Sequence, residues 1–389
     1  MLPSIRCRRT NLIRRPCLSA RLSTSSVLLA NRAIVYSSFG NPSEVLSAIT
    51  YPDLPPPPSK SLNVKYILSP INPADLNVIE NKYHSKPSPV SSLSEGRHKF
   101  PEPHYVGGNE GLAEVTEVGP DVTHYKVGDR VVLTKQQSGT WASARTLHED
   151  DVLKIPVGLS EVNAATITVN PPTAYNMLHS FVEPKEGDLV MQNGANSAVG
   201  QAVIQIAARK GIRTLNFVRN RPDIDSLKNY LQSLGATHVF TYDDLKDKET
   251  VQNIKTTITK KGTSLMLNCV SGEPTKDMTR LLADSATLVS YGAMSKQPLI
   301  LPTSLFIFRD LRCRGFWQSK WYEEHSIQQR EELMKTLAEL KLREPEYEIL
   351  NLKGTASDEE VAQQVRSVIA KIQEGRYGRK VLLRFEPAQ

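Results

Sequence analysis

Apolar and polar positions follow different patterns in the two parts of the chain. Residues 33–165 contain short runs of apolar residues at alternate positions, separated by turns, and this pattern predicts strands. The clearest runs are 32–40, 63–72, 111–122 and 128–135. Between them, the proline-rich segment 54–60 predicts a rigid turn, because proline donates no hydrogen bond to a central strand. Residues 84–104 are polar and rich in proline and serine, and they predict a long loop.

From about residue 188 the pattern changes to an alternation of strands and helices. Apolar runs predict strands at 188–193, 213–218, 237–242, 264–270, 286–292 and 311–316. Helical spacing predicts helices at 199–210, 223–234, 250–260, 275–283 and 302–310. This alternation requires parallel strands with right-handed crossovers, so we expect a doubly wound sheet of the dinucleotide-binding type. Helices at 326–341 and 356–373, the second with a Ser357–Glu360 capping box, precede a last strand at 379–385.

The turn after the first of these six strands departs from the usual glycine-rich sequence. A G-x-G-x-x-G motif would fall on Ala195, Ser197 and Gly200, so only the third glycine is present. A pyrophosphate needs backbone N–H groups at the start of a helix and a close approach of the main chain. Alanine and serine are small enough to allow that approach, and the serine hydroxyl adds a donor. We therefore expect this turn to bind a dinucleotide.

An arginine stands at the position that distinguishes the two nicotinamide cofactors. A cofactor without a 2′-phosphate is usually bound there by an acidic residue, about 20 residues beyond the turn. Here Arg219 lies 19 residues after Gly200, and Arg221 follows it. A guanidinium matches a phosphate in shape and charge, so both arginines indicate NADPH rather than NADH.

The positive charge of the chain is concentrated at its start. Residues 1–32 contain seven arginines and neither lysine nor acid, which accounts for the whole formal net charge of +7. Such a segment is typical of a mitochondrial presequence, and we expect residues 1–32 to direct the chain to the mitochondrial matrix. The remainder is neutral by count, which argues against nucleic-acid binding. No apolar run approaches the ~18 residues of a membrane span.

The cysteines and histidines show no metal-binding pattern. The four cysteines (Cys7, Cys17, Cys269 and Cys313) are far apart, and the eight histidines are scattered. The spacing of a four-ligand zinc site is absent, so we expect no metal.

Eight stretches carry a family resemblance. They are INPADLNVIENKY (71–83), GGNEGLAEV (107–115), TVNPPTAYNML (168–178), QNGANSAVGQAVIQIA (192–207), VRNRPD (218–223), LNCVSG (267–272), YGAMSKQP (291–298) and RGFWQS (314–319). With them the chain resembles the zinc-free branch of the medium-chain dehydrogenase/reductase superfamily, and within it the mitochondrial trans-2-enoyl-thioester reductases of fungal type. Zinc-dependent relatives have a ligand histidine where Asn109 stands and a ligand cysteine near Asn72, and both ligands are missing here.

The resemblance implies an α/β fold, a cofactor and a set of site residues. A GroES-like β-rich catalytic domain would comprise 33–167 and 332–389, and an inserted Rossmann domain, 168–331, would carry the doubly wound parallel sheet and bind NADPH. Tyr83 would donate the proton, or order a water that does, and would polarise the carbonyl. Asn72 and Trp317 would shape the pocket. The cofactor contacts would be Asn170, Asn196, Ser197, Ala198, Val199, Arg219, Asn220, Arg221, Tyr291, Gly292, Ala293, Met294, Phe316, Trp317, Gln318 and Lys380. The family also implies a homodimer.

The implied reaction is the NADPH-dependent reduction of a trans-2-enoyl thioester to a saturated acyl thioester, the last step of an elongation cycle of mitochondrial fatty acid synthesis. The acyl group would be carried by acyl carrier protein or coenzyme A, and the basic stretch 96–99 is a candidate contact for an acidic carrier. Two alternatives remain open. One is a quinone or enone oxidoreductase of the same fold, and the other is a non-enzymatic role in nucleic-acid binding or coregulation.

Overall fold

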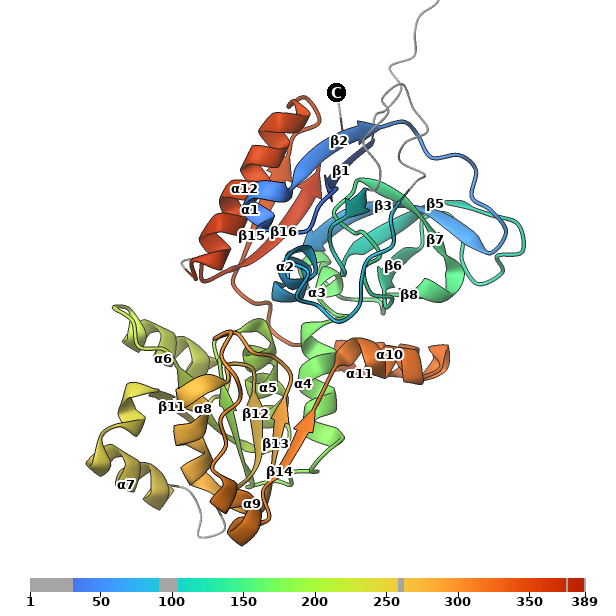
Figure 1. Cartoon of the computed structure of the whole chain (residues 1–389). Coiled ribbons are helices and arrows are strands. Elements are labelled where there is room, and N and C mark those ends of the chain that lie inside the picture. Colours follow the sequence, from blue (N-terminus) through green and yellow to red (C-terminus); the bar gives the residue numbers. More distant parts are fainter. Residues whose placement is uncertain (1–30, 91–103, 258–261, 376, 388–389) are drawn as a thin grey trace, which may run out of the picture.

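The structure, a computed structural model, describes residues 31–90, 104–257, 262–375 and 377–387. The predicted presequence up to residue 30, the basic stretch 96–99 and most of the predicted loop 84–104 lie outside these residues. None of the helices in the described ranges is both long enough and apolar enough to cross a membrane. In Figure 1 the chain forms two parts, one above the other.

The lower part in Figure 1 contains a parallel sheet of six strands. The strands lie in the order β11-β10-β9-β12-β13-β14, which is that of a doubly wound dinucleotide-binding sheet. All six correspond to strands that the sequence predicts, so the predicted sheet is confirmed. Their bounds are β9 (Leu189–Asn193), β10 (Arg213–Val218), β11 (His238–Thr241), β12 (Thr263–Asn268), β13 (Leu282–Ser290) and β14 (Arg312–Gly315).

Helices cover both faces of this sheet. One face packs against α4 (Asn170–His179) and α5 (Ala198–Arg209) through apolar side chains such as Met177 and Val203. The other face packs against residues of α7 (Lys248–Thr257), α8 (Gly272–Met278) and α9 (Thr303–Arg309). A further helix, α6 (Ile224–Ser233), packs on α5. The predicted helix 275–283 is wrong in its second half, because a short 3₁₀ turn ends at Leu281 and β13 begins at Leu282.

The upper part consists of two further sheets. One has the order β15-β16-β3-β5-β6-β8, with β7 paired to β3, and the other has the order β2-β1-β4. The last strand of the chain lies between β15 and β3, so segments from both ends of the chain form this part, as expected for a GroES-like domain. The bounds are β1 (Asn31–Tyr36), β2 (Ser47–Tyr51), β3 (Ser61–Pro70), β4 (Tyr105–Val106), β5 (Leu112–Val118), β6 (Arg130–Leu133), β7 (Ala144–His148), β8 (Val152–Lys154), β15 (Tyr347–Leu352) and β16 (Lys380–Phe385).

The remaining helices cover the sheets of the upper part or connect the two parts. They are α1 (Pro42–Val45), α2 (Pro73–Ile79), α3 (Glu161–Ala165), α10 (Gln318–Glu324), α11 (Ile327–Glu339) and α12 (Asp358–Gln373). The predicted helices 326–341 and 356–373 correspond to α11 and α12. The predicted capping box is present, because the Ser357 hydroxyl accepts from the Glu360 N–H and the Glu360 carboxylate accepts from the Ser357 N–H.

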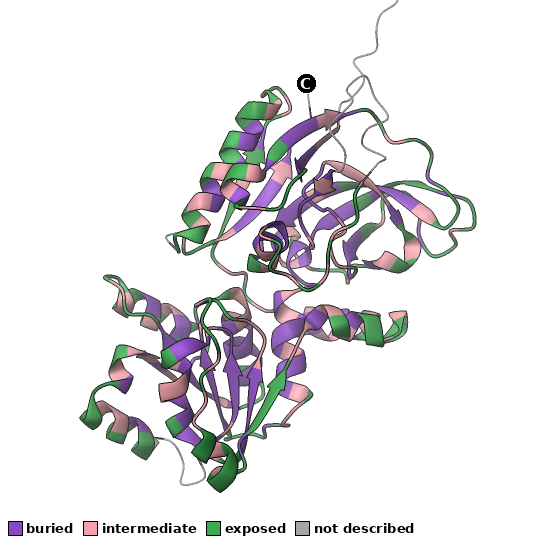
Figure 2. Ribbon diagram, in the orientation of Figure 1, coloured by how far each residue is buried: buried purple, intermediate pink, exposed green. Residues whose placement is uncertain are grey.

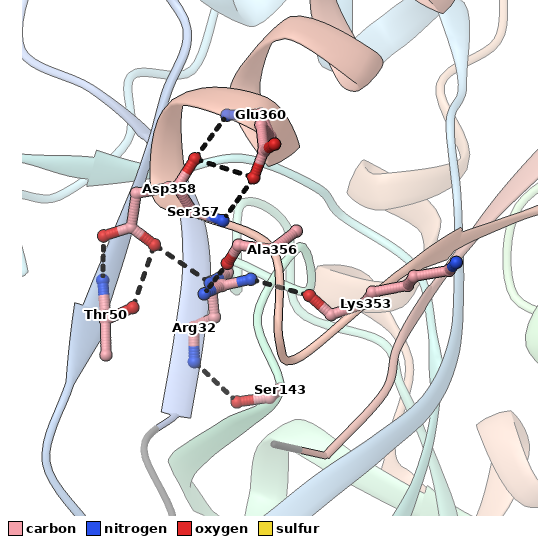
Figure 3. A network of polar contacts seen from close by, with 8 residues as sticks. All are labelled: Arg32, Thr50, Ser143, Lys353, Ala356, Ser357, Asp358 and Glu360. Carbon is pink, nitrogen blue, oxygen red and sulfur yellow. Dashed lines mark hydrogen bonds and ion pairs between the residues drawn. The ribbon is translucent and has the colours of Figure 1, made fainter. Parts of the chain in front are cut away.

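Arg32 joins the first strand to the start of α12, as Figure 3 shows. Its guanidinium forms an ion pair with Asp358, with 2.9 Å between Nε and Oδ1, and donates to the carbonyl oxygens of Lys353 and Ala356 at 3.0 and 2.7 Å. Asp358 in turn accepts from the backbone N–H and the hydroxyl of Thr50, at 2.9 and 2.8 Å. Arg32, the last residue of the predicted presequence, is therefore part of the folded protein.

Candidate active site

Gly200, in the first turn of α5, is the motif glycine that the chain keeps, and there the backbone leaves no room for a side chain. A Cβ on Gly200 would lie 2.6 Å from backbone atoms of Ala195, a distance that a real side chain does not reach. The Ser197 side chain caps α5 by accepting from the Gly200 N–H at 3.1 Å. Asn196 and Ser197 are exposed at this end of the helix. The turn thus presents the positive end of a helix to an anion, without the two missing glycines.

Arg219 follows the end of β10 and is exposed. Its guanidinium lies beside the loop after α12, since a Cβ on Gly375 would be 3.3 Å from Nη2. Among the described residues it has no carboxylate at ion-pairing distance, whereas Arg221 Nε lies 3.1 Å from Asp223 Oδ1. Of the two predicted arginines, Arg219 is therefore the one whose charge is available to a phosphate.

Residues 291–294 form a loop that follows β13 and lies against the end of β12. The Tyr291 N–H donates to the Asn268 carbonyl oxygen at 2.9 Å, and the Met294 N–H donates to that of Cys269 at 2.8 Å. Gly292 is half-buried, while Ala293 and Met294 are exposed. The carboxyl ends of β12 and β13 thus place this loop at the sheet edge where doubly wound folds bind their ligands.

Three further predicted residues meet at a cleft between the two parts. Asn170 at the start of α4, Ala198 at the start of α5 and Lys380 at the start of β16 all line this open cleft. Two other predicted residues have structural partners instead. Phe316 packs edge-to-face on Phe181, with ring centres 6.0 Å apart, and Gln318 accepts from the Asn176 side chain at 3.0 Å.

Tyr83 and Trp317 are 234 residues apart in the chain and form a hydrogen bond in the structure. The indole Nε1–H donates to the Tyr83 hydroxyl oxygen at 2.8 Å, and the two rings meet edge to face. Tyr83 follows α2 of the upper part, and Trp317 follows β14 of the lower sheet. Burial raises the pKa of Tyr83 above its ordinary value of 10.0. The hydrogen bond from Trp317 lowers this pKa, and the negative charge of Asp75 raises it.

A buried carboxylate, Glu110, links the upper part to the segment that leads into α4. Its Oε1 accepts from the backbone N–H groups of Thr168 and Val169, at 3.0 and 2.8 Å, and its Oε2 accepts from the Asn72 side chain at 2.9 Å. Lys380 donates to the Asn72 side-chain oxygen. Burial raises the pKa of Glu110, and the positive charge of Lys380 partly opposes the rise. Burial in turn lowers the pKa of Lys380.

Asp75 is a second buried carboxylate in the same cluster. It accepts from the backbone N–H of Asn72 at 2.7 Å and from the Asn109 side chain at 2.6 Å. Burial raises its pKa from 3.8 to about 6, although both hydrogen bonds and the charge of Lys380 act in the opposite direction. Asn109, which by the resemblance replaces a ligand histidine, and Asn72, near which a ligand cysteine is expected, thus have their side chains engaged in hydrogen bonds. The described residues contain no group of three or more histidine, cysteine or acidic side chains that could hold a metal ion.

Asp75 and Glu110 are the functional-site candidates that sequence reasoning missed. Both lie inside stretches that carry the family resemblance, Asp75 in 71–83 and Glu110 in 107–115. Both stretches contain other polar residues, so nothing in the sequence distinguished these two carboxyl groups from exposed ones.

Comparison with known proteins first defines the class. Residues 58–157 match the alcohol dehydrogenase GroES-like domain, and residues 198–339 match the zinc-binding dehydrogenase family. Together with the observed sheet order, these matches define a member of the medium-chain dehydrogenase/reductase superfamily.

Individual relatives then define the family. The chain is 42% identical over 309 residues to human mitochondrial enoyl-[acyl-carrier-protein] reductase, covering 79% of this chain and 78% of that protein. It resembles the structure of the mitochondrial 2-enoyl thioester reductase Etr1p/Etr2p heterodimer from Candida tropicalis, with a TM-score of 0.81, 31% identity and coverage of 92% and 100%. A complex of Etr1p with NADP and crotonyl-CoA matches with the same score, identity and coverage. The chain belongs to the mitochondrial enoyl-[acyl-carrier-protein] reductase family.

The raised pKa of Asp75 predicts how stability depends on pH. In the folded protein the carboxyl group keeps its proton up to about pH 6, whereas in the unfolded chain it loses the proton near 3.8. The folded state binds more protons between these values, so its stability falls as the pH rises through this window. A shift of about two pKa units corresponds to about 3 kcal/mol.

Asp75→Asn removes this titration. Between about pH 4 and about pH 7, the unfolding free energy of the wild type should fall by about 2–3 kcal/mol relative to that of the variant, measured by urea unfolding. Asp225→Asn, at an exposed position of α6, is the control. A difference between wild type and Asp75→Asn that stays constant with pH would contradict the prediction.

Proposed function

We propose that this chain reduces trans-2-enoyl thioesters to saturated acyl thioesters with NADPH. The observation that carries the proposal is the hydrogen bond between Tyr83 and Trp317, which places a half-buried tyrosine between the upper part and the cofactor-binding sheet. The relatives named above are enoyl-[acyl-carrier-protein] reductases, and a similar structure contains NADP and crotonyl-CoA.

The residues around the β9–α5 turn fit a dinucleotide that carries a 2′-phosphate. The packing of Gly200 on Ala195 brings the helix N-terminus close to the main chain of the turn, and a pyrophosphate would bind to Asn196, Ser197, Ala198 and Val199 there. Arg219 would bind the 2′-phosphate, with Asn220 and Arg221 beside it. The loop Tyr291–Met294, together with Asn170, Phe316, Trp317, Gln318 and Lys380, would enclose the nicotinamide end. When bound, NADPH supplies a hydride to Cβ of the substrate.

Tyr83 is suited to supply the proton that Cα then takes. An indole N–H can only donate, so the bond from Trp317 occupies a lone pair of the Tyr83 oxygen and leaves the tyrosine's own hydrogen free to point toward the substrate. The raised pKa keeps the hydroxyl protonated at neutral pH. The same hydrogen can stabilise charge that develops on the thioester oxygen. Tyr83 thus acts as the acid, and Trp317 orients it.

Replacing Tyr83 tests the acid directly. Tyr83→Phe should lower the turnover of crotonyl-CoA by about 100-fold or more, because a positioned acid contributes at least that much. NADPH binding, measured by the fluorescence of the cofactor, should be kept. Tyr347→Phe, an exposed tyrosine on β15, is the matched control. Near-normal turnover by Tyr83→Phe would remove the acid role.

Replacing Arg219 tests the choice of cofactor. Arg219→Ala should raise the KM for NADPH by about 10- to 100-fold, the effect of losing a charged hydrogen bond, and should leave the KM for NADH within about twofold. Arg221→Ala is the comparison variant and should have a smaller effect, because Arg221 is already paired with Asp223. Equal changes for both cofactors in Arg219→Ala would contradict a contact with the 2′-phosphate.

We further propose that the protein is a homodimer whose interface includes β14. Every residue of this strand is exposed, and it lies at the edge of the parallel sheet, where it is drawn in green in Figure 2. The neighbouring α9 exposes Ile307 and Phe308, with 67% and 80% of their surfaces accessible. An exposed edge strand beside exposed apolar side chains is a surface that a second copy can cover.

Charged substitutions on α9 test this interface. Ile307→Asp and Phe308→Asp should each convert the dimer to a monomer in light scattering, because a buried carboxylate without a partner costs several kcal/mol. Val157→Asp, at a fully exposed apolar position in the upper part, should leave the mass unchanged. A wild-type protein that is monomeric at micromolar concentration would refute the proposal.

The proposal extends to the location of the protein in the cell, its domain bounds and the carrier of its substrate. We propose that the first residues of the chain are a presequence that directs it to the mitochondrial matrix, and that its cleavage leaves Arg32 in place, since Arg32 binds the start of α12. We propose a catalytic domain of 33–167 and 332–389 and a cofactor-binding domain of 168–331, although the second boundary falls inside α11. The substrate would be carried by acyl carrier protein or coenzyme A.

A further inference from the structure

Glu80 contacts three segments that surround the candidate active site. Glu80 is the C-cap residue of α2, and Tyr83 lies three residues after it. Its Oε2 lies 2.7 Å from the Lys82 ammonium and 3.6 Å from that of Lys296, and its Oε1 accepts from the Gln373 side chain at 3.2 Å. Its side chain is only 11% exposed, so solvent screens these contacts less than at an open surface.

Lys296 reaches Glu80 from the other part of the molecule. It ends the turn that contains Ala293 and Met294, and its N–H donates to the Ala293 carbonyl oxygen at 2.8 Å. The backbone N–H of Met294 in this turn is bonded to the end of β12. The turn is therefore attached to the cofactor-binding sheet, whereas Glu80 is attached to α2 and the Tyr83 loop.

Lys82 provides an internal comparison. It pairs with the same carboxylate at a shorter distance, but it lies in the same loop as Tyr83 and connects no second segment. Burial tends to raise the pKa of Glu80, yet the bond from Lys82 and the charge of Lys296 hold it below its ordinary value, so Glu80 is ionised at neutral pH.

We propose that the Glu80–Lys296 ion pair holds the Tyr83 loop at a fixed distance from the cofactor-binding loop, which makes both residues positioning residues for proton transfer. Neither side chain touches the reacting atoms in this account. The proposal rests on the proposed reduction of enoyl thioesters. A displacement of the acid by about 1 Å is enough to lower the rate of a reaction that depends on alignment.

A cycle of four proteins tests the pair, with crotonyl-CoA and NADPH as substrates. Glu80→Gln and Lys296→Met should each lower kcat by about 3- to 10-fold and leave the dissociation constant of NADPH within about twofold. In the double variant kcat should fall no further than in the less active of the two single variants, because the effects of two residues that act through one contact are not additive. Lys82→Met should retain kcat within about twofold.

Several results would overturn the proposal. One is an unchanged kcat in Lys296→Met, and another is a loss of kcat in Lys82→Met equal to that in Lys296→Met. A third is a loss of kcat in the double variant equal to the product of the two single losses. The last is weaker NADPH binding in Lys296→Met, which would indicate a direct contact with the ligand. Lys296 is 66% exposed, so Lys296→Met tests the pair even if a substitution at Glu80 disturbs folding. A wild type without activity on enoyl thioesters would instead refute the proposed function.

Discussion

The buried carboxylate of Glu110 is the interaction on which the rest of the site depends. It is 1% exposed and binds the two backbone N–H groups that lead into α4, as well as the side chain of Asn72. Asn72 in turn begins α2, and α2 leads to Tyr83. An unpaired carboxylate at this depth would be very costly, so the contacts of Glu110 constrain the catalytic part and the cofactor-binding part together.

The same polar cluster contains Asn109 and Asn72, the positions at and near which the family resemblance places the ligands of zinc-dependent relatives. Here Asn72 and Asn109 donate to Asp75, Lys380 donates to the Asn72 side chain, and that side chain also donates to Glu110. In the proposed reaction the Tyr83 hydroxyl would polarise the thioester oxygen, and the hydrogen bond from Trp317, in the other part of the molecule, would orient that hydroxyl.

The sequence predicted the cofactor-binding sheet well and the catalytic part less completely. Six strands alternate with helices, and this period is visible because strands such as β9, β10 and β12 are largely buried, whereas β14 is exposed along its whole length. The helix α4 was not predicted, because it begins Asn170-Pro171-Pro172 and buries polar as well as apolar residues. The strand β15 was missed because only one of its six residues is buried, and its apolar residues do not alternate regularly with polar ones. The roles of Asp75 and Glu110 depend on contacts between distant segments, which spacing along one chain does not encode.

The most direct test of the account follows deuterium from cofactor and solvent into the product. NADPH that carries deuterium at the transferable position of the nicotinamide is incubated with crotonyl-CoA, and the product is analysed by NMR. The account predicts butyryl-CoA with deuterium at Cβ, and with ordinary NADPH in heavy water it predicts deuterium at Cα. Oxidation of NADPH without a saturated thioester, or solvent deuterium at Cβ, would contradict it.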